Sequence, residues 1–273
     1  MALNDISLTA GMRSNLLSLQ GTVDLLNRTQ DRLSTGKKVN APLDNPTNYF
    51  LAKSLSDRAS DISVAKDEMG EGIQTLKAAD AGIKAIEGLI ASGKGIAQSA
   101  KSAASTEIAS LQTQFNAILT QITNAANDSY YKGVNLLEAG SLSVNLGEGS
   151  TLTVTGFTAT ATGLAVSQAG SGSGQLNWAT STNIDSSITQ LETATTTLRT
   201  QAKTLSANLN IVSIRQDFAN NMINTLLKGA DNLTLADMNE EGANMLMLQT
   251  RQALGTTALS LSAQAAQSVL RLF

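Results

Sequence analysis

Two long rows of apolar residues, recurring every seven positions, constrain what this chain can fold into. The first row consists of Leu55, Ile62, Met69, Leu76, Ile83, Ile90 and Ala97. The second consists of Ile184, Leu191, Leu198, Leu205, Val212, Ala219, Leu226 and Leu233. A seven-residue repeat keeps one side of a helix apolar and is typical of helices that wind around each other. A shorter amphipathic stretch covers residues 108–125. Because none of these patterns contains a proline, the sequence predicts long helices packed side by side rather than a globule.

Both ends of the chain carry further apolar rows. Residues 16–33 carry one row with spacings of three and four, whereas residues 254–273 carry two adjacent rows that continue to Phe273. Two adjacent rows are wider than a two-stranded coiled-coil seam, so the single N-terminal row cannot cover them. The sequence therefore predicts a homo-polymer. Its predicted subunit-interface residues are Leu16, Leu19, Val23, Leu26, Leu33, Leu254, Ala258, Leu259, Leu261, Leu270, Leu272 and Phe273.

The residue types present argue against several classes of function. The chain contains no His and no Cys, which excludes imidazole bases, thiolate nucleophiles and the usual zinc, copper and haem ligand sets. We therefore predict no enzyme activity, and no catalytic, metal-binding or cofactor-binding residue. A net charge of −3 without a dense Lys/Arg run argues against nucleic acid binding. The apolar runs are too short for a membrane span or for the core of a signal peptide, so we expect neither.

Prolines and glycines divide the helical pattern into segments. Pro42 and Pro46 separate the N-terminal helix from the long central one, and residues 127–133 indicate a turn. Residues 140–175 are rich in Gly, Ser and Thr; within them, 150–156 alternates like a strand and 169–174 is typical of a flexible loop. The predicted fold class is mainly α: a long antiparallel helical rod or coiled-coil bundle formed by both termini, with a small β-rich insertion.

Five short segments, which carry four motifs in the right order, resemble those of a known family. Residues 33–45 read LSTGKKVNAPLDN and residues 131–137 read YKGVNLL. Residues 1–6 read MALNDI, and the closing helix contains NMLMLQTRQALG at 244–255 and QAAQSVLRLF at 264–273. Each segment is similar to a flagellin motif. The chain as a whole resembles bacterial flagellin, with the likeness weakest over residues 140–182.

This resemblance implies a structural subunit that self-assembles into the bacterial flagellar filament used for swimming. Terminal helices at 1–41 and 236–273 would form the inner tube of the filament. Residues 42–139 and 183–235 would form a surrounding helical rod domain, and residues 140–182 a small surface-exposed β/loop insertion. The implied partners are other copies of the chain, the flagellar export apparatus with its chaperone, and the hook-associated and cap proteins. The implied location is extracellular, reached without a cleaved signal peptide.

Several alternatives stay open at this point. A hook–filament junction protein of the same superfamily would keep the terminal helices but lack the matches at 33–45 and 131–137. A soluble coiled-coil adaptor would not explain an apolar row that continues to Phe273. The central helix contains glycines at 70, 72, 82, 88, 93 and 95. These glycines indicate either close helix packing with local flexibility, or helix-weakening residues that are tolerated because the bundle holds the helix. The Ser/Thr cluster between 150 and 200 indicates either O-linked sugars or a plain solvated surface.

Overall fold

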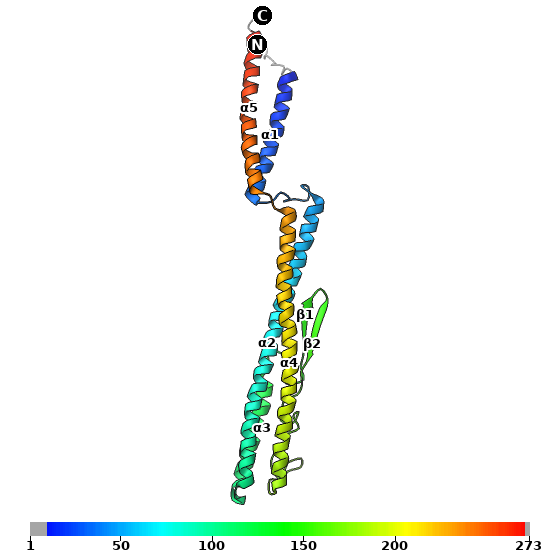
Figure 1. Ribbon diagram of the computed structural model, residues 1–273, viewed down its shortest axis with the longest axis vertical. Helices are drawn as coiled ribbons and strands as arrows, with labels where there is room; N and C mark the ends of the chain where they lie inside the picture. The colour runs from blue at the N-terminus through cyan, green and yellow to red at the C-terminus, as the bar shows by residue number, and fades with distance from the viewer. Residues whose placement is uncertain (1–9, 271–273) are drawn as a thin grey trace, which may run out of the picture. The chain divides into compact units, whose positions relative to one another are not determined.

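The structure is a computed structural model that describes residues 10–270, apart from the side chains of Ala10, Ala266, Val269 and Leu270. Within that range the chain has five α-helices and one two-stranded sheet (Figure 1). The helices are α1 (Ala10–Thr35), α2 (Pro46–Ser102), α3 (Ser105–Asp128), α4 (Ser181–Thr234) and α5 (Met238–Leu270). The strands are β1 (Ser141–Gly147) and β2 (Ser150–Thr155). The mainly α fold class is therefore confirmed.

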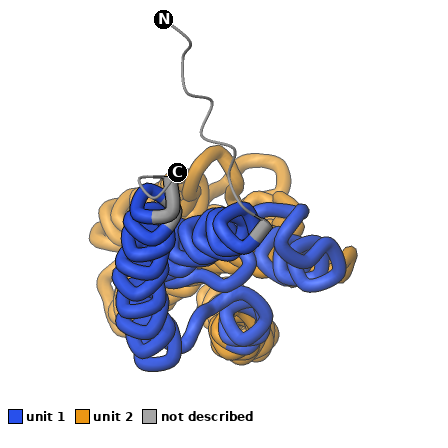
Figure 2. The backbone as a smooth tube through the Cα atoms, turned by 90° about the horizontal axis from the view of Figure 1, so that it is seen from above, with its two compact units in different colours: residues 1–58, 225–273 blue, residues 59–224 orange. Residues whose placement is uncertain are grey.

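The chain forms two compact units, coloured separately in Figure 2. Unit 1 combines the residues up to Arg58 with those from Thr225 onward, and unit 2 runs from Ala59 to Asn224. Helices α1 and α5 belong to unit 1 alone, whereas α2 and α4 contribute to both units. The unit boundaries thus fall inside helices, while the helix breaks predicted from the prolines lie within unit 1.

The heptad rows form the core of unit 2. Every member of the α2 row from Ile62 to Ala97 is buried. Every member of the α4 row from Ile184 to Ala219 is buried as well. Because a seven-residue repeat holds one side of each helix toward its partner, the two rows supply a continuous apolar contact.

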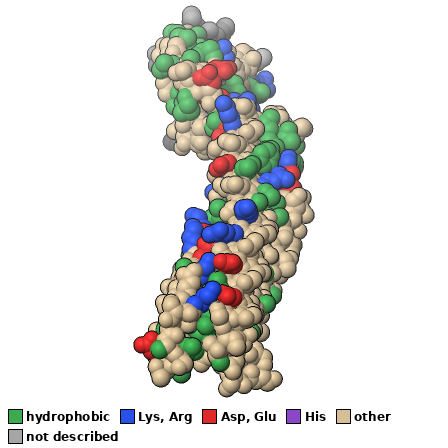
Figure 3. Space-filling view, turned by 60° about the horizontal axis from the view of Figure 1, so that its bottom comes forward, with side chains coloured by type: hydrophobic (Ala, Val, Ile, Leu, Met, Phe, Trp, Pro, Cys, Tyr) green, Lys and Arg blue, Asp and Glu red, His purple; other side chains and the backbone are tan. Residues whose placement is uncertain are grey.

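Ion pairs on the surface of unit 2 show the relative direction of α2 and α4. Three pairs join the helices, with N–O distances of 3.6, 2.6 and 2.6 Å: Glu87–Arg199, Lys94–Glu192 and Lys101–Asp185. The numbers fall along α4 as they rise along α2, so the helices are antiparallel. Figure 3 shows one face on which charges of both signs lie side by side. Exposed pairs contribute little stability, so we assign these the role of favouring one register.

Helix α3 adds a third helix to this core. Gly93 of α2 lies where the three helices meet, since a methyl group there would touch Phe115 and Ile118 of α3 and Leu191 of α4. The distances from that methyl group, 3.5–3.7 Å, are ordinary van der Waals contacts, so the three helices meet at this point with room for a methyl group.

Residues 141–180 are held more firmly than the sequence predicted. Strands β1 and β2 pair in antiparallel fashion and bury Val144 and Val154. The segment that follows ends in Trp178, which is completely buried. Its ring centroid lies 4.8 Å from that of Phe115, and its Nε1 donates a hydrogen bond to Ser187 Oγ at 2.9 Å.

The flexible loop expected at 169–174 also needs correction. The amide side chain of Asn116 on α3 donates to the Ala169 carbonyl at 2.7 Å and accepts from the Ala169 N–H at 2.8 Å. Ala169 itself is buried. The segment is therefore attached to α3 at its first residue, whose two backbone polar groups are both paired, whereas residues 171–174 are exposed.

Candidate subunit-contact surface

Helices α1 and α5 form the helix pair of unit 1, and local signals define its ends. Helix α1 stops at Gly36, whose φ of 71° is a left-handed conformation and whose N–H donates to the Arg32 carbonyl at 2.8 Å. Helix α5 begins after Asp237, whose Oδ1 accepts from the N–H groups of Asn239 and Glu240 at 2.9 and 3.3 Å. Both helices therefore end where the sequence supplies a capping residue.

The two connections beside this pair bind each other through the backbone. The N–H groups of Lys38 and Val39 donate to the Thr234 carbonyl at 2.7 and 3.3 Å. The Ala236 N–H donates to the Gly36 carbonyl at 2.9 Å. The segment at 33–45 that carried the family resemblance is thus the piece of chain that ties the α1–α2 connection to the α4–α5 connection.

Asp44 forms hydrogen bonds that shape the end of the 33–45 segment. Its Oδ2 accepts from the N–H groups of Ala41 and Asn40 at 2.9 and 3.0 Å. These hydrogen bonds, of which that from Ala41 has the larger effect, hold the pKa of Asp44 below its ordinary value. The positive charges of Arg28 and Arg32 lower the pKa further. The carboxylate therefore organises the turn that leads into α2.

One ion pair joins α1 to α5. Arg32 Nη1 lies 2.9 Å from Glu241 Oε1, with Glu241 buried and Arg32 half-buried. Glu241 occupies the first turn of α5 and Arg32 the last turn of α1, so each charge also complements the dipole of its own helix.

Six of the predicted contact residues lie along the helix pair itself. All six are half-buried: Leu16, Leu19, Val23, Leu26 and Leu33 of α1, and Leu259 of α5. The approach is close at Gly255, where a methyl group would lie 2.5 Å from Leu19 Cδ1. These side chains hold α1 against α5, and each still presents part of its surface to the outside.

A different side of α5 carries apolar residues that α1 does not cover. Leu254 is 66% exposed and Leu261 is 62% exposed, and Ala258 is exposed too. Met247, seven residues before Leu254, is 49% exposed and extends the same row. We call Met247, Leu254, Ala258 and Leu261 the outer stripe. Met247 was not among the predicted contact residues, although its seven-residue spacing from Leu254 is the signal that identifies it.

The remaining predicted contact residues lie at the end of the chain. Leu272 and Phe273 are outside the described residues, and of Leu270 only the backbone is described.

The YKGVNLL segment forms a tight turn in unit 2. Tyr131 and Val134 exchange two backbone hydrogen bonds of 3.0 Å, and Lys132 and Gly133 between them have φ values of 46° and 81°. Asn135 then donates from Nδ2 to the carbonyls of Ala126 and Asn127 at 2.8 and 3.0 Å. The amide of Asn135 therefore satisfies carbonyls at the C-terminal end of α3.

Two kinds of feature were not found in the described part of the chain. Across residues 10–270, no group of three or more acidic side chains is placed to hold a metal ion. Over the same range, no helix is long and apolar enough to span a membrane.

Comparison with known proteins decides the family. The family model described as the bacterial flagellin N-terminal helical region matches residues 6–141. Flagellin FljO of Caulobacter vibrioides is 32% identical over 279 residues, which cover 100% of this chain and 100% of that protein. The chain belongs to the bacterial flagellins. A flagellin of Brucella melitensis biotype 1 is 29% identical over 279 residues, covering 99% of this chain and 97% of the relative.

As a flagellin, the chain is a structural subunit of the flagellar filament, which lies outside the cell, and it polymerises with copies of itself. The hook–filament junction alternative is not favoured, since the full-length relatives are filament flagellins. Among solved structures, a Bacillus cereus flagellin superimposes with a TM-score of 0.47 and 18% identity, over 56% of this chain and 88% of that chain. That likeness is too low to add to the assignment.

Proposed function

We propose that the outer stripe of α5 is the contact through which this flagellin polymerises, with the half-buried row of α1 and α5 acting as the seam that holds the helix pair together. The observation that carries this proposal is the exposure of Leu254 and Leu261 at regular spacing on a helix that already has a partner. Exposed leucines on one side of a helix favour association, because an apolar surface gains free energy when another surface covers it. Arg251 is the one charged residue on this side, between Met247 and Leu254.

The energies support this division of roles. Full burial of one Leu side chain contributes about 1.5–3 kcal/mol. Ordering one residue of an isolated helix costs about 1–2 kcal/mol of backbone entropy. A helix pair with one narrow seam is therefore marginal by itself, and contact of the outer stripe with neighbouring copies supplies the missing free energy.

We further propose the domain organisation implied by the family. The terminal segments 1–41 and 236–273 form the inner tube of the filament, 42–139 and 183–235 form the rod domain, and 140–182 lies on the outer surface. The helix breaks at 36–45 and 235–237 support the first boundaries. The buried Trp178 supports a close attachment of the outer segment to the rod.

The implied partners and the structural role follow in the same way. We propose that the chain is exported by the flagellar export apparatus with a chaperone, that it meets the hook-associated and cap proteins, and that it has no enzyme activity. The support is membership of a family of structural proteins, together with the lack of His and Cys.

The exposed threonines of β2 are the best candidates for O-linked sugars. Thr151, Thr153 and Thr155 all point to the exposed side of the hairpin. By contrast, Thr193 and Thr200 of α4 donate their hydroxyl hydrogens to backbone carbonyls at 2.9 and 3.0 Å. Peptide mapping of native filaments by mass spectrometry tests this assignment, which fails if β2 carries no added mass.

A charge-insertion experiment tests the contact proposal. The double variant Leu254→Glu/Leu261→Glu places two carboxylates in the outer stripe, where burial without a partner costs several kcal/mol. We expect a soluble subunit with unchanged helical circular dichroism and no filaments by electron microscopy. The control is Gln249→Glu, an exposed change on another side of the same helix. It should leave both the circular dichroism and the formation of filaments unchanged. Normal filaments from the double variant would disprove the role of the outer stripe.

A further inference from the structure

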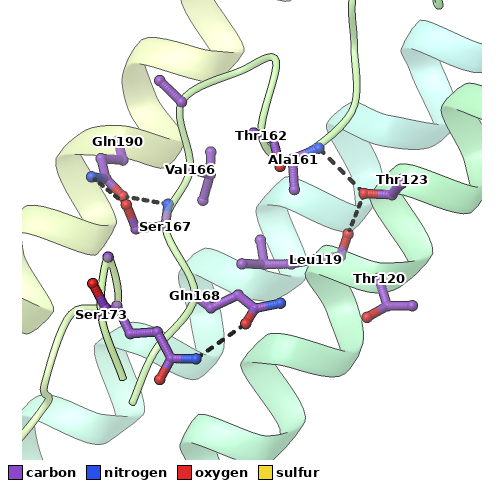
Figure 4. Close-up of a pocket in the computed structure, with 13 residues that line it drawn as sticks. Leu119, Thr120, Thr123, Ala161, Thr162, Val166, Ser167, Gln168, Ser173 and Gln190 are labelled. Atoms are coloured by element: carbon purple, nitrogen blue, oxygen red, sulfur yellow. Dashed lines mark hydrogen bonds between the residues drawn. The ribbon is translucent and has the colours of Figure 1, made fainter. Parts of the chain in front are cut away.

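A groove in unit 2 takes no part in the contact surface described above. It lies between α3, α4 and the chain that runs from Ala161 to Gln175, and it has a volume of about 690 Å³ (Figure 4). The apolar side chains of Leu119, Ala161 and Val166 lie buried beneath it, and the exposed Ala165 adds an apolar group to the lining. Its walls carry hydroxyl and amide side chains from all three parts of the chain.

The lining of this groove contains no charged side chain. None of the 13 lining residues is Asp, Glu, Lys or Arg. The other hollows described in the structure differ, since each includes at least one charged residue. An ion entering the groove would lose water without gaining an opposite charge, and a purely apolar molecule would leave the wall groups unpaired. The lining therefore favours a neutral molecule with many hydrogen-bonding groups.

Hydrogen bonds inside the protein fix the amides in place. Gln190 Oε1 accepts from the Ser167 N–H at 2.9 Å, and Gln190 Nε2 donates to Ser167 Oγ at 3.4 Å. Gln168 Oε1 accepts from Gln175 Nε2 at 3.3 Å. In Figure 4 the nitrogen of the Gln168 amide points away from Gln175.

Two hydroxyl groups add to this set. The side chains of Thr162 and Ser173 line the groove and make no hydrogen bond with any other described residue. A hydroxyl both donates and accepts, so each of these groups matches a hydroxyl of a ligand in either direction.

We propose that this groove binds a neutral sugar. The ring hydroxyls of a sugar would pair with Gln168, Thr162 and Ser173, and its C–H face would lie against Ala165, an exposed apolar residue of the lining. The groove has no aromatic side chain on which a ring could stack. Its affinity for a single sugar unit is therefore low, with a Kd on the order of 1–10 mM.

Ligand-observed NMR on the full chain, expressed in a host that adds no O-linked sugars, tests this proposal. The probes are methyl glucoside and N-acetylglucosamine as neutral sugars, with glucuronate and glucosamine as charged ones. We expect at least one neutral sugar to bind, with the charged sugars about tenfold weaker. Binding of neither neutral sugar, or equal binding of the charged ones, would overturn the proposal.

Variants locate the binding. Gln168→Leu removes the oriented amide with little change in volume and should weaken sugar binding at least fivefold. Gln114→Leu, an exposed change on α3 outside the groove, is the matched control and should bind as the unchanged chain does. Circular dichroism and filament assembly should be normal for both variants. Equal sugar binding by Gln168→Leu would place the sugar elsewhere and overturn the assignment.

The sugar has two conceivable sources, a free saccharide or a sugar chain carried by another copy. Filaments grown in the native cell are compared with filaments assembled from the unglycosylated chain. Free sugar that binds both kinds of filament equally identifies an external ligand. Free sugar that binds only the unglycosylated filaments shows that an attached sugar already occupies the groove. Exclusion of free sugar from both, when the unassembled chain binds it, would overturn a role for the groove in the filament.

Discussion

At the scale of single residues, the turn at 131–134 shows how one side chain offsets an unfavourable backbone. Lys132 adopts a left-handed conformation that non-glycine residues seldom take. Its Nζ lies 2.9 Å from Glu71 Oε2, and the Tyr131 hydroxyl donates to the same oxygen at 3.0 Å. The Lys132 and Tyr131 hydrogen bonds hold the pKa of Glu71 below its ordinary value of 4.5. One carboxylate on α2 thus holds both turn residues.

This arrangement predicts a pH-dependent effect of Glu71→Gln. Because the folded-state pKa of Glu71 is lowered, its stabilising contribution is present above pH 4.5 and is lost as the pH falls through the folded value. We expect Glu71→Gln to lower the Tm at neutral pH and to match the unchanged chain at acid pH. Glu68→Gln, which changes an exposed carboxylate on the same helix, is the control and should show a much smaller effect. A Tm difference between Glu71→Gln and the unchanged chain that stays constant from neutral to acid pH would contradict the role of Glu71.

At the scale of elements, the helical glycines fall into two classes that their spacing does not reveal. A methyl group on Gly82 would collide with Ser129 and Leu137, whereas a methyl group on Gly88 would meet nothing within 4 Å. Close packing therefore explains Gly82 and Gly72, while Gly88 and Gly95 are positions that the bundle tolerates. Both alternatives that the sequence left open apply, at different residues.

Alanine substitution separates these two classes. We expect Gly82→Ala to destabilise the chain by about 1–3 kcal/mol, because the added methyl group overfills a packed site. Gly88→Ala should instead stabilise it by about 0.5–1 kcal/mol through better helix propensity. Urea unfolding followed by circular dichroism measures both. Similar changes of the same sign would show that the packing around Gly82 has been misjudged.

The elements also show how far the sequence could predict the fold. The helices were predictable because a heptad row fixes which side of a helix is buried, as the α2 and α4 rows confirm. Residues 156–180 were predicted poorly, since Leu164, Val166 and Trp178 are buried without any periodic spacing. At the contact surface, the C-terminal rows were visible in the sequence. Their division into an inner seam and an outer stripe depends on where α1 lies, which spacing does not specify.

At the scale of the whole molecule, the two units differ in what supports them. Unit 2 has a core of its own built from α2, α3 and α4. Among the described apolar side chains of α1 and α5 in unit 1, only Met12 and Leu248 are buried, and several others are exposed. Isolated helices of this kind are marginal in water, so we expect assembly to complete the folding of α1 and α5.

Limited proteolysis checks this difference. In the unassembled subunit, cleavage should begin within α1 and α5 and leave a resistant fragment near residues 45–235, because local opening is cheapest where few apolar contacts are made. In filaments, α1 and α5 should resist the same protease. Equal resistance of these helices in both states would mean that the helix pair is stable without neighbouring copies.

The most direct test of the central claim measures the solvent accessibility of the outer stripe before and after assembly. The chain has no Cys, so Leu254→Cys introduces a single thiol at the centre of the stripe. We expect rapid maleimide labelling in the unassembled subunit and labelling slowed by about 100-fold or more in filaments. Labelling of Leu254→Cys at the same rate in filaments and subunits would contradict this expectation.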